Sequence, residues 1–186
     1  PFQTSWGVST RLIGGIIMTH GDNNGLVLPP KIAPVQIALI PIAFHKEGVL
    51  DKAHEVADTL RAAGLRVKTD ESEQSPGWKF AEYEMKGVPL RLELGPKDIE
   101  NGQCVMVRRD NGEKTVVALD EVVQKAQELL DQVHHGMYEK AKKNLTDHIY
   151  DAETLEEAKR LQQEHGGFIR TMGCGEEACE LRMKEE

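Results

Sequence analysis

The stretch GVPLRLELGPKD, residues 87–98, alternates between apolar and charged side chains until a Gly-Pro pair ends it. Val88 and the three leucines at every second position after it fall on one side of a period-two strand, whereas Arg91 and Glu93 fall on the other. One face of this strand is therefore expected in a core and the other at the surface. Because Gly-Pro cannot continue a ladder of strand hydrogen bonds, the strand should end at Leu94.

The segment upstream predicts a strand–helix–strand unit. PVQIALIPIAF at residues 34–44 is apolar enough for a buried strand. GVLDKAHEVADTLRAAG at residues 48–64 has apolar residues at helical spacing and ends on Gly64, a typical C-terminal cap. LRVKTD at residues 65–70 is expected to be the next strand, and a second helix is expected at about 77–86.

The segment downstream adds a hairpin and a closing helix. QCVMVRRDNGEKTVVAL at residues 103–119 contains two strand patterns joined by Asp-Asn-Gly, which is a strong hairpin signal. A helix from about residue 119 follows, and we expect it to break near His135-Gly136. The sequence therefore predicts an α/β domain with a mixed sheet of about five strands flanked by three helices.

The last part of the chain predicts a small α+β domain. Its helices are expected in MYEKAKKNLTDHIYD and AETLEEAKRLQQEHGG, with Asp151 or Thr154 as the N-cap of the second. FIRTM at residues 168–172 is expected to be a short strand. We therefore divide the chain into three parts, which are residues 1–33, 34–133 and 134–186.

Composition and charge exclude several classes of protein. No apolar run approaches the length of a membrane span. Three cysteines, of which Cys104 lies in an apolar strand pattern, argue against a secreted domain held by disulfides, so we expect a reducing, cytoplasmic location. The net charge of −8 disfavours nucleic-acid binding. However, residues 151–186 hold ten acids and five bases, whereas residues 86–114 hold six bases and five acids.

Charged side chains cluster around the strand in residues 87–98. Arg91 is on its outer face, and Lys97 and Asp98 follow its Gly-Pro exit. The hairpin contributes three further cations to the same sheet, Arg108, Arg109 and Lys114. Such a surface suits base recognition, because cations donate to guanine O6 and N7 while a carboxylate accepts from the guanine Watson–Crick edge. The alternative is a solvated strand face followed by ordinary turn residues.

Two other features leave alternatives open. Cys174 and Cys179 have a spacing that structural zinc sites use, but no second pair follows, so they are either half of a zinc site or two reduced thiols near a surface turn. WGVSTRLIGG at residues 6–15 is either a phosphate-binding segment, through its glycines and Arg11, or a Gly-rich helix packed closely on a neighbour.

Three long strings in the sequence resemble the prolyl-tRNA synthetase family in its archaeal and eukaryotic-like branch. The final motif of the class II catalytic domain, leading into the anticodon-binding domain, is similar to QTSWGVSTRLIGGIIMTHGDNNGLVLPPKIAPVQ. The anticodon-binding domain itself is similar to SPGWKFAEYEMKGVPLRLELGPKD and VRRDNGEK. The resemblance covers essentially the whole chain, and it makes residues 1–33 the end of a catalytic domain.

The resemblance implies roles for individual residues. In the family, the last class II motif ends on an arginine that contacts the ATP phosphates, here Arg11, with Ser9 nearby and Gln3 upstream in a position used for ATP. The family's contacts with the guanines shared by proline anticodons would fall on Glu84, Arg91, Lys97, Asp98 and Lys114. Relatives with a zinc site have a second cysteine pair, so Cys174 and Cys179 match half of that site.

The resemblance also implies partners and cofactors. The full-length enzyme would attach proline to its tRNA with ATP and Mg²⁺, and it would be a homodimer. Because the earlier class II motifs are absent from this sequence, we expect the chain to be a piece of a longer protein that supplies anticodon recognition. The alternatives are a chain that acts on ATP by itself and a synthetase-derived domain that binds RNA or proteins without catalysis.

Overall fold

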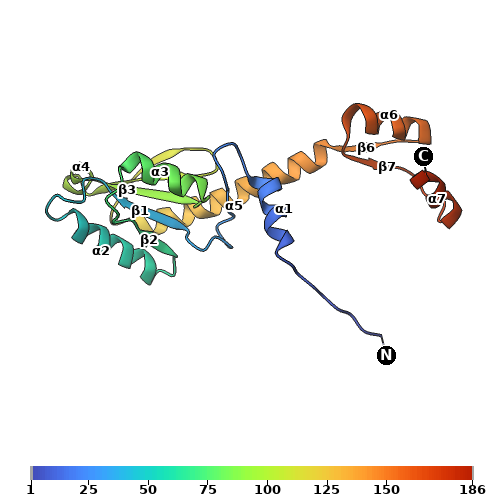
Figure 1. Cartoon of the computed structure of the whole chain (residues 1–186). Coiled ribbons are helices and arrows are strands. Elements are labelled where there is room, and N and C mark those ends of the chain that lie inside the picture. Colours follow the sequence, from blue (N-terminus) through green and yellow to red (C-terminus); the bar gives the residue numbers. More distant parts are fainter. Residues whose placement is uncertain (1, 186) are drawn as a thin grey trace. The chain divides into compact units, whose positions relative to one another are not determined.

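The computed structural model describes residues 2–185, which divide into two compact units on either side of the Tyr138–Glu139 bond (Figure 1). In the first unit the elements are α1 (Arg11–His20), β1 (Ile37–Pro41), α2 (Val49–Ala62), β2 (Val67–Thr69), α3 (Pro76–Met85), β3 (Leu90–Leu94), α4 (Pro96–Glu100), β4 (Gln103–Arg108) and β5 (Lys114–Ala118). Helix α5 (Val122–Asp147) begins in this unit. The second unit adds β6 (Ile149–Asp151), α6 (Leu155–His165), β7 (Phe168–Arg170) and α7 (Glu177–Glu185).

The first unit is built on a five-stranded mixed sheet with the order β2-β1-β3-β4-β5. Strand β1 runs parallel to β2 and β3, whereas β4 runs antiparallel to β3 and β5. Arg91 of β3 lies opposite Val107 of β4, which in turn lies opposite Lys114 of β5. Paired residues share a face, so Arg91 and Lys114 lie in one row across the sheet. The predicted mixed α/β fold is confirmed.

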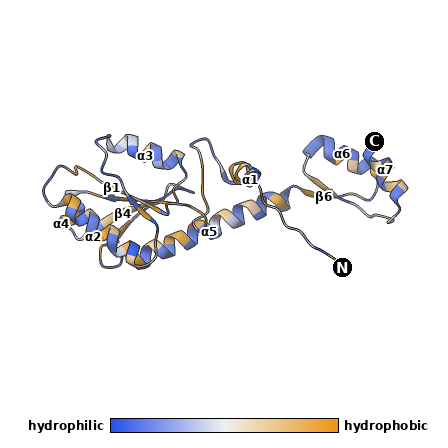
Figure 2. Cartoon of the chain, turned by 60° about the horizontal axis from the view of Figure 1, so that its bottom comes forward, coloured by the Kyte–Doolittle hydropathy of each residue, from blue (hydrophilic) through white to orange (hydrophobic). Residues whose placement is uncertain are grey.

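One face of the sheet carries the main core. The alternating leucines of β3, Leu90, Leu92 and Leu94, are fully buried there. They cluster with apolar residues of α2, such as Leu60, and of α5, such as Val133. Figure 2 shows the result as orange positions on strands and inner helix surfaces, with blue positions outside. Burial of this apolar area supplies most of the driving force for folding.

The opposite face is covered only in part. Helix α3 packs against β1, where Tyr83 clusters with Ala38 and Ile40. Toward the other edge of the sheet, Val116 is 62% exposed and Lys114 is also exposed. This face therefore carries the charged residues of β3, Arg91 and Glu93, which are partly buried, and the exposed Lys114 of β5. We call it the open face.

A buried lysine fixes α3 on the sheet. The Lys79 side chain is 1% exposed, and its Nζ donates to the backbone oxygen of Asp70 at 2.9 Å. The same ammonium lies 3.4 Å from the Asp70 carboxylate and 5.2 Å from the centre of the Phe44 ring. These contacts join the end of β2, the loop after β1 and the first turn of α3, which sets where the later turns of α3 meet the open face.

The predicted break near His135-Gly136 is wrong, because α5 continues without interruption to Asp147. A glycine inside a helix costs only about 1 kcal/mol. Burial of Val133 and Met137 on either side of it offsets that cost. A Cβ at Gly136 would lie 3.4 Å from the Asp110 carboxylate, an ordinary van der Waals distance, so the hairpin lies beside α5 at this position. Tertiary packing of the flanking residues thus keeps the helix intact through Gly136, and the local sequence pattern contains no information on that packing.

The second unit contains a two-stranded parallel sheet, β6 with β7, and mostly hydrophilic α6 (Figure 2). Thr154 is the N-cap of α6, and its hydroxyl accepts from the amide of Glu157 at 3.2 Å. The Glu157 carboxylate accepts from the amide of Glu153, the residue before the N-cap, at 3.0 Å. The expected α+β composition is confirmed, although residues 149–151 form a strand where we expected helix.

No helix formed by residues 2–185 combines the length and the apolar character needed to cross a membrane.

Candidate nucleic-acid interface

The open face ends in a cavity of about 400 Å³. Three of the predicted anticodon contacts line it together, which are Glu84, Arg91 and Lys114. Glu84 comes from the last turn of α3, Arg91 from β3, and Lys114 from the start of β5. A site built from one carboxylate and two cations thus forms where the end of α3 meets the three neighbouring strands of the sheet.

Arg91 lines this cavity and is held by two side-chain contacts. Its side chain is 16% exposed, its Nε donates to Glu93 Oε1 at 2.9 Å, and its guanidinium carbon lies 4.1 Å from the centre of the Phe80 ring. Glu93 follows Arg91 on the same side of β3, so strand alternation brings the two side chains together. The guanidinium is planar and carries five N–H donors, so these contacts orient it without using all of them.

Glu84 of α3 and Lys114 of β5 complete the charged set. Glu84 is half-buried, and its Oε1 accepts from the side-chain amide of Asn24 at 2.9 Å. Lys114 is exposed, and no ion pair of its ammonium is found within residues 2–185. In the cavity, Glu84 therefore supplies a hydrogen-bond acceptor held by Asn24, and Arg91 supplies donors held by Glu93. Lys114 supplies an exposed positive charge.

Arg109 is a structural part of the cavity wall. Its side chain is 5% exposed and forms a bidentate ion pair with Asp22, with N–O distances of 2.8 and 2.7 Å. Its Nε donates to the backbone oxygen of Glu84 at 2.8 Å. The hydrogen bonds from Arg109 are the largest influence that lowers the pKa of Asp22, from 3.8 to about 2. The guanidinium charge is thus balanced within the fold.

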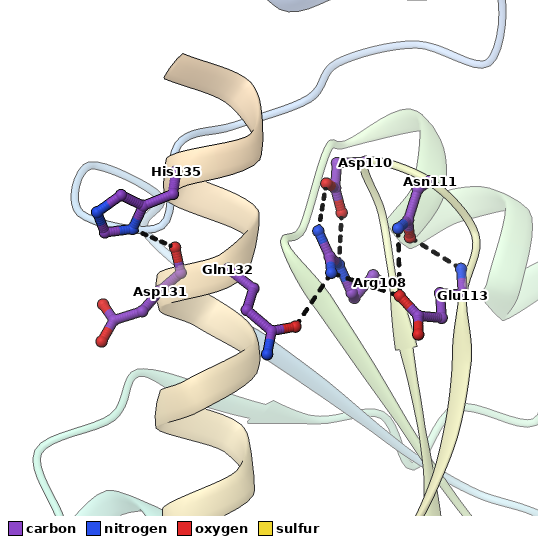
Figure 3. A network of polar contacts seen from close by, with 7 residues as sticks. All are labelled: Arg108, Asp110, Asn111, Glu113, Asp131, Gln132 and His135. Atoms are coloured by element: carbon purple, nitrogen blue, oxygen red, sulfur yellow. Dashed lines mark hydrogen bonds and ion pairs between the residues drawn. The ribbon is translucent and has the colours of Figure 1, made fainter. Parts of the chain in front are cut away.

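Arg108 is balanced in the same way (Figure 3). Its guanidinium donates to both carboxylate oxygens of Asp110, at 3.0 and 2.7 Å, and to the Glu113 carboxylate at 3.4 Å. It also donates to Gln132 Oε1 on α5 at 3.2 Å, which ties the hairpin to that helix. Carboxylates within the fold therefore pair with both hairpin arginines, whereas no ion pair of Lys114 is found within residues 2–185.

Comparison with known proteins matches this part of the chain to a family. Residues 36–129 match a family model described as anticodon binding domain. The chain belongs to the anticodon-binding domain family. Its matched range contains β1 to β5 and the start of α5, and thus all three charged residues that line the cavity.

Longer relatives extend the similarity to almost every residue. Proline–tRNA ligase of Clostridium novyi (strain NT) is 58% identical over 183 residues, which are 98% of this chain and 38% of that protein. Proline–tRNA ligase of Clostridium botulinum (strain Okra / Type B1) is 56% identical over 185 residues, 100% of this chain and 38% of the relative. Proline–tRNA ligase 2 of Bacillus cereus is 54% identical over 184 residues, which are 99% of this chain and 38% of that protein. The resemblance to the prolyl-tRNA synthetase family is confirmed, and the chain spans about two fifths of the length of these relatives.

Lys97 and Asp98, the other two predicted contacts, lie beyond the opposite end of β3. Both are in the short helix α4, and neither lines the cavity in the described part of the chain. Lys97 is exposed, whereas the Asp98 carboxylate accepts from the amide of Gly95 at 2.9 Å. The aspartate therefore caps the first turn of α4, a short helix in place of the turn that was one of the two alternatives for these residues.

The residues predicted for ATP are exposed. Gln3 and Ser9 precede α1, and Arg11 is its first residue. The amide of Arg11 donates to Ser9 Oγ at 3.4 Å, so these two residues lie together at the helix start. No residue of α1 is buried, and added Cβ atoms at Gly14 and Gly15 would meet nothing within 4 Å in the described residues. Close packing therefore does not account for these glycines in this structure.

Cys174 and Cys179 lie together in the second unit. Hydrogen bonds from the backbone of Glu176 and then from the Cys179 thiol lower the pKa of Cys174. Hydrogen bonding to Cys174 raises the pKa of Cys179. Residues 2–185 contain no group of three or more His, Cys, Asp or Glu side chains that could hold a metal ion. Two thiols alone do not fit a closed tetrahedral zinc site.

Asp22 and Asn24 also line the cavity but were not predicted as site residues, and both precede the range that matches the anticodon-binding domain. The only local signal was a Gly-Asp-Asn-Asn run, which is typical of a turn. The Asn24 amide indeed donates to Asp22 Oδ1 at 2.9 Å, as in an Asx-turn. Nothing in that pattern reveals that the turn lies against the end of α3.

Proposed function

We propose that the cavity at the end of the open face binds the anticodon of a proline tRNA, and that the chain contributes this recognition to a full-length proline–tRNA ligase. The observation that carries the proposal is the convergence of Glu84, Arg91 and Lys114 on one cavity in an anticodon-binding domain. The similarity to proline–tRNA ligases over nearly the whole chain supports the choice of tRNA.

The chemistry of these three side chains suits guanine. A guanine base exposes acceptors at O6 and N7 and donors at N1 and N2. Arg91, held by Glu93 and Phe80, presents oriented donors to the acceptors, and the Glu84 carboxylate accepts from the donors. Lys114 adds an exposed positive charge for the base or for the phosphate beside it. An adenine presents a donor where guanine has O6, so Arg91 keeps the N7 acceptor but loses the second one.

Lys97 and Asp98 extend the proposed interface to the exit of β3. Lys97 is exposed there and is open to contact with RNA. One oxygen of Asp98 caps α4, and the carboxylate can accept from a base with its remaining lone pairs. In this proposal they contact anticodon guanines as a second group, separate from the cavity.

In the full-length enzyme, the proposed partners are proline, ATP with Mg²⁺, and a second copy in a homodimer in the cytoplasm. Arg11 would bind ATP phosphates through its permanently charged guanidinium, with Ser9 and Gln3 beside it in the nucleotide site. One arginine cannot supply adenylate chemistry by itself, since the reaction needs a pocket and metal-bound phosphates. The chain alone should therefore show no proline-dependent exchange of pyrophosphate into ATP, and turnover near that of a complete ligase would contradict this assignment.

The function is tested by titrating the chain with two RNA stem-loops at matched salt. One carries a proline anticodon, and the other is identical except that adenine replaces the anticodon guanines. We expect the guanine-bearing stem-loop to bind at least ten-fold more tightly, because each well-placed base contact contributes about 1 to 3 kcal/mol. Equal affinity for the two RNAs would overturn the proposal.

A further inference from the structure

A closed ring of hydrogen bonds surrounds Glu84. The Asn24 side-chain amide donates to Glu84 Oε1 at 2.9 Å, and the Asn24 backbone amide donates to Asp22 Oδ1 at 2.9 Å. Asp22 is paired at 2.7 and 2.8 Å with Arg109, whose Nε donates to the backbone oxygen of Glu84 at 2.8 Å. The ring thus holds both the backbone and the carboxylate of Glu84.

The turn that supplies Asp22 and Asn24 is itself fixed on the end of α3. The amide of Leu26 donates to the backbone oxygen of Met85 at 2.9 Å. Gly25 has a φ of +127°, and a Cβ there would come within 2.5 Å of the same Met85 oxygen. Only glycine fits this close approach. The backbone contact between Leu26 and Met85 joins two segments about sixty residues apart, and it places the Asn24 side chain next to Glu84.

We propose that Asn24 is a positioning residue for anticodon recognition, which aims the Glu84 carboxylate at the guanine edge, and that Arg109 holds Asn24 and Glu84 in register. This inference rests on the proposed function. The amide of Asn24 occupies Glu84 Oε1, so the other carboxylate oxygen is left to accept from the base. A carboxylate fixed before binding loses less side-chain freedom when the RNA arrives.

Burial and pairing distinguish this role from direct contact with RNA. Arg109 is 5% exposed and already paired with a carboxylate, so it acts through its neighbours rather than as a phosphate-binding cation. Asn24 is exposed and lines the cavity, so its own amide is accessible to RNA as well. The test must therefore separate a residue that orients Glu84 from one that contacts the base.

A double-mutant cycle makes this separation, because coupled residues give non-additive effects. The variants are Asn24→Ala, Glu84→Ala and the double variant, each titrated with the guanine-bearing stem-loop and its adenine counterpart. We expect Asn24→Ala to weaken binding of the guanine-bearing RNA by about 3- to 10-fold while changing the adenine RNA less than two-fold. In the Glu84→Ala background the same substitution should cause no further loss.

Asn23→Ala is the matched control, because Asn23 is an exposed neighbour of the same type and does not line the cavity among the described residues. It should leave both affinities unchanged. Asn24→Asp should bind guanine-bearing RNA more weakly than Asn24→Ala, because the new carboxylate would repel the Glu84 carboxylate and displace it. Thermal unfolding midpoints of the Asn24 variants should stay close to that of the unsubstituted chain, because the side chain is exposed.

Other outcomes distinguish a failure of the positioning role of Asn24 from a failure of the proposed function. Full preference for guanine by Asn24→Ala, or an equal loss with and without Glu84, would overturn the positioning role while the proposed function stands. No preference for guanine by the unsubstituted chain would overturn the proposed function and this inference together.

Discussion

The side chains of β3 alternate between the two faces of the five-stranded sheet and have different roles on each. On the packed face, the leucines of β3 are fully buried against α2 and α5. On the open face, the same strand presents Arg91 and Glu93, each 16% exposed and paired with one another at 2.9 Å. Alternation in a single five-residue strand thus divides its side chains between stability and the proposed recognition of RNA.

The difference also shows where charge remains available on the molecule. Arg108 and Arg109 lie in the same hairpin as Lys114, but each guanidinium is paired with a carboxylate of the fold. Lys114 is exposed at the row that it shares with Arg91. A count of cations along the sequence therefore overstates the positive charge of the open face. In the proposed function, specificity for guanine must come from the few side chains that line the cavity, Glu84, Arg91 and Lys114.

Leu92→Ala should show the largest effect, on the packed face. Removing a fully buried leucine leaves a cavity, so we expect the free energy of unfolding to fall by about 2 to 5 kcal/mol. The guanine preference of the molecules that stay folded should not change. Urea unfolding measures the first quantity and stem-loop titration the second. A folded Leu92→Ala variant that has lost its preference would show that the two faces are not separable.

Asp98→Asn should show a smaller effect, at the exit of β3. A carboxylate that accepts from guanine is replaced partly by a donor, so affinity for the guanine-bearing stem-loop should fall by about 1 kcal/mol. If Asp98 acts only through its charge, removing that charge should instead tighten binding to both RNAs. Calorimetry at matched salt distinguishes the two results, with circular dichroism to confirm that α4 and the sheet remain folded.

The ion pair between Asp22 and Arg109 should show the smallest effect. The pKa of Asp22 is lowered from 3.8 to about 2, so its contribution to stability is present above about pH 4 and is lost as the pH falls through 2. Because the Asp22 side chain is 37% exposed, solvent screening keeps this contribution at about 1 kcal/mol or less. Unfolding free energies of the chain and of Asp22→Asn should therefore differ at pH 6, and the difference should shrink below pH 4 and vanish below pH 2. A gap that stays constant over this range would contradict the pairing.

The sequence predicted the parts of the fold that local pattern determines. Alternation located β3, the Asp-Asn-Gly turn located the β4–β5 hairpin, and Gly64 marked the end of α2. It failed where packing decides, since α5 passes through Gly136 because flanking residues are buried. Short elements, such as α4 and β6, were also missed, because a few residues give no clear period.

For the candidate site, the sequence and the family resemblance named Glu84, Arg91 and Lys114, which the structure brings together. They did not reveal which cations are already paired. Asp110 and Glu113 lie close to Arg108 in the sequence, but closeness along the chain does not show that the side chains pair. The partner of Arg109 is Asp22, which comes from a distant segment. Contacts between segments that are far apart along the chain leave no local signature. The roles of the site residues in RNA binding stay predictions.

The central claim, that the open face reads guanine through the cavity, is tested most directly by Arg91→Ala with the two stem-loops. We expect affinity for the guanine-bearing RNA to fall by about 1 to 3 kcal/mol, while affinity for the adenine RNA barely changes. Arg91→Lys is the matched control, and it should recover only part of the preference because an ammonium lacks the planar fork of donors. An equal loss for both RNAs, or no loss for either, would contradict the account.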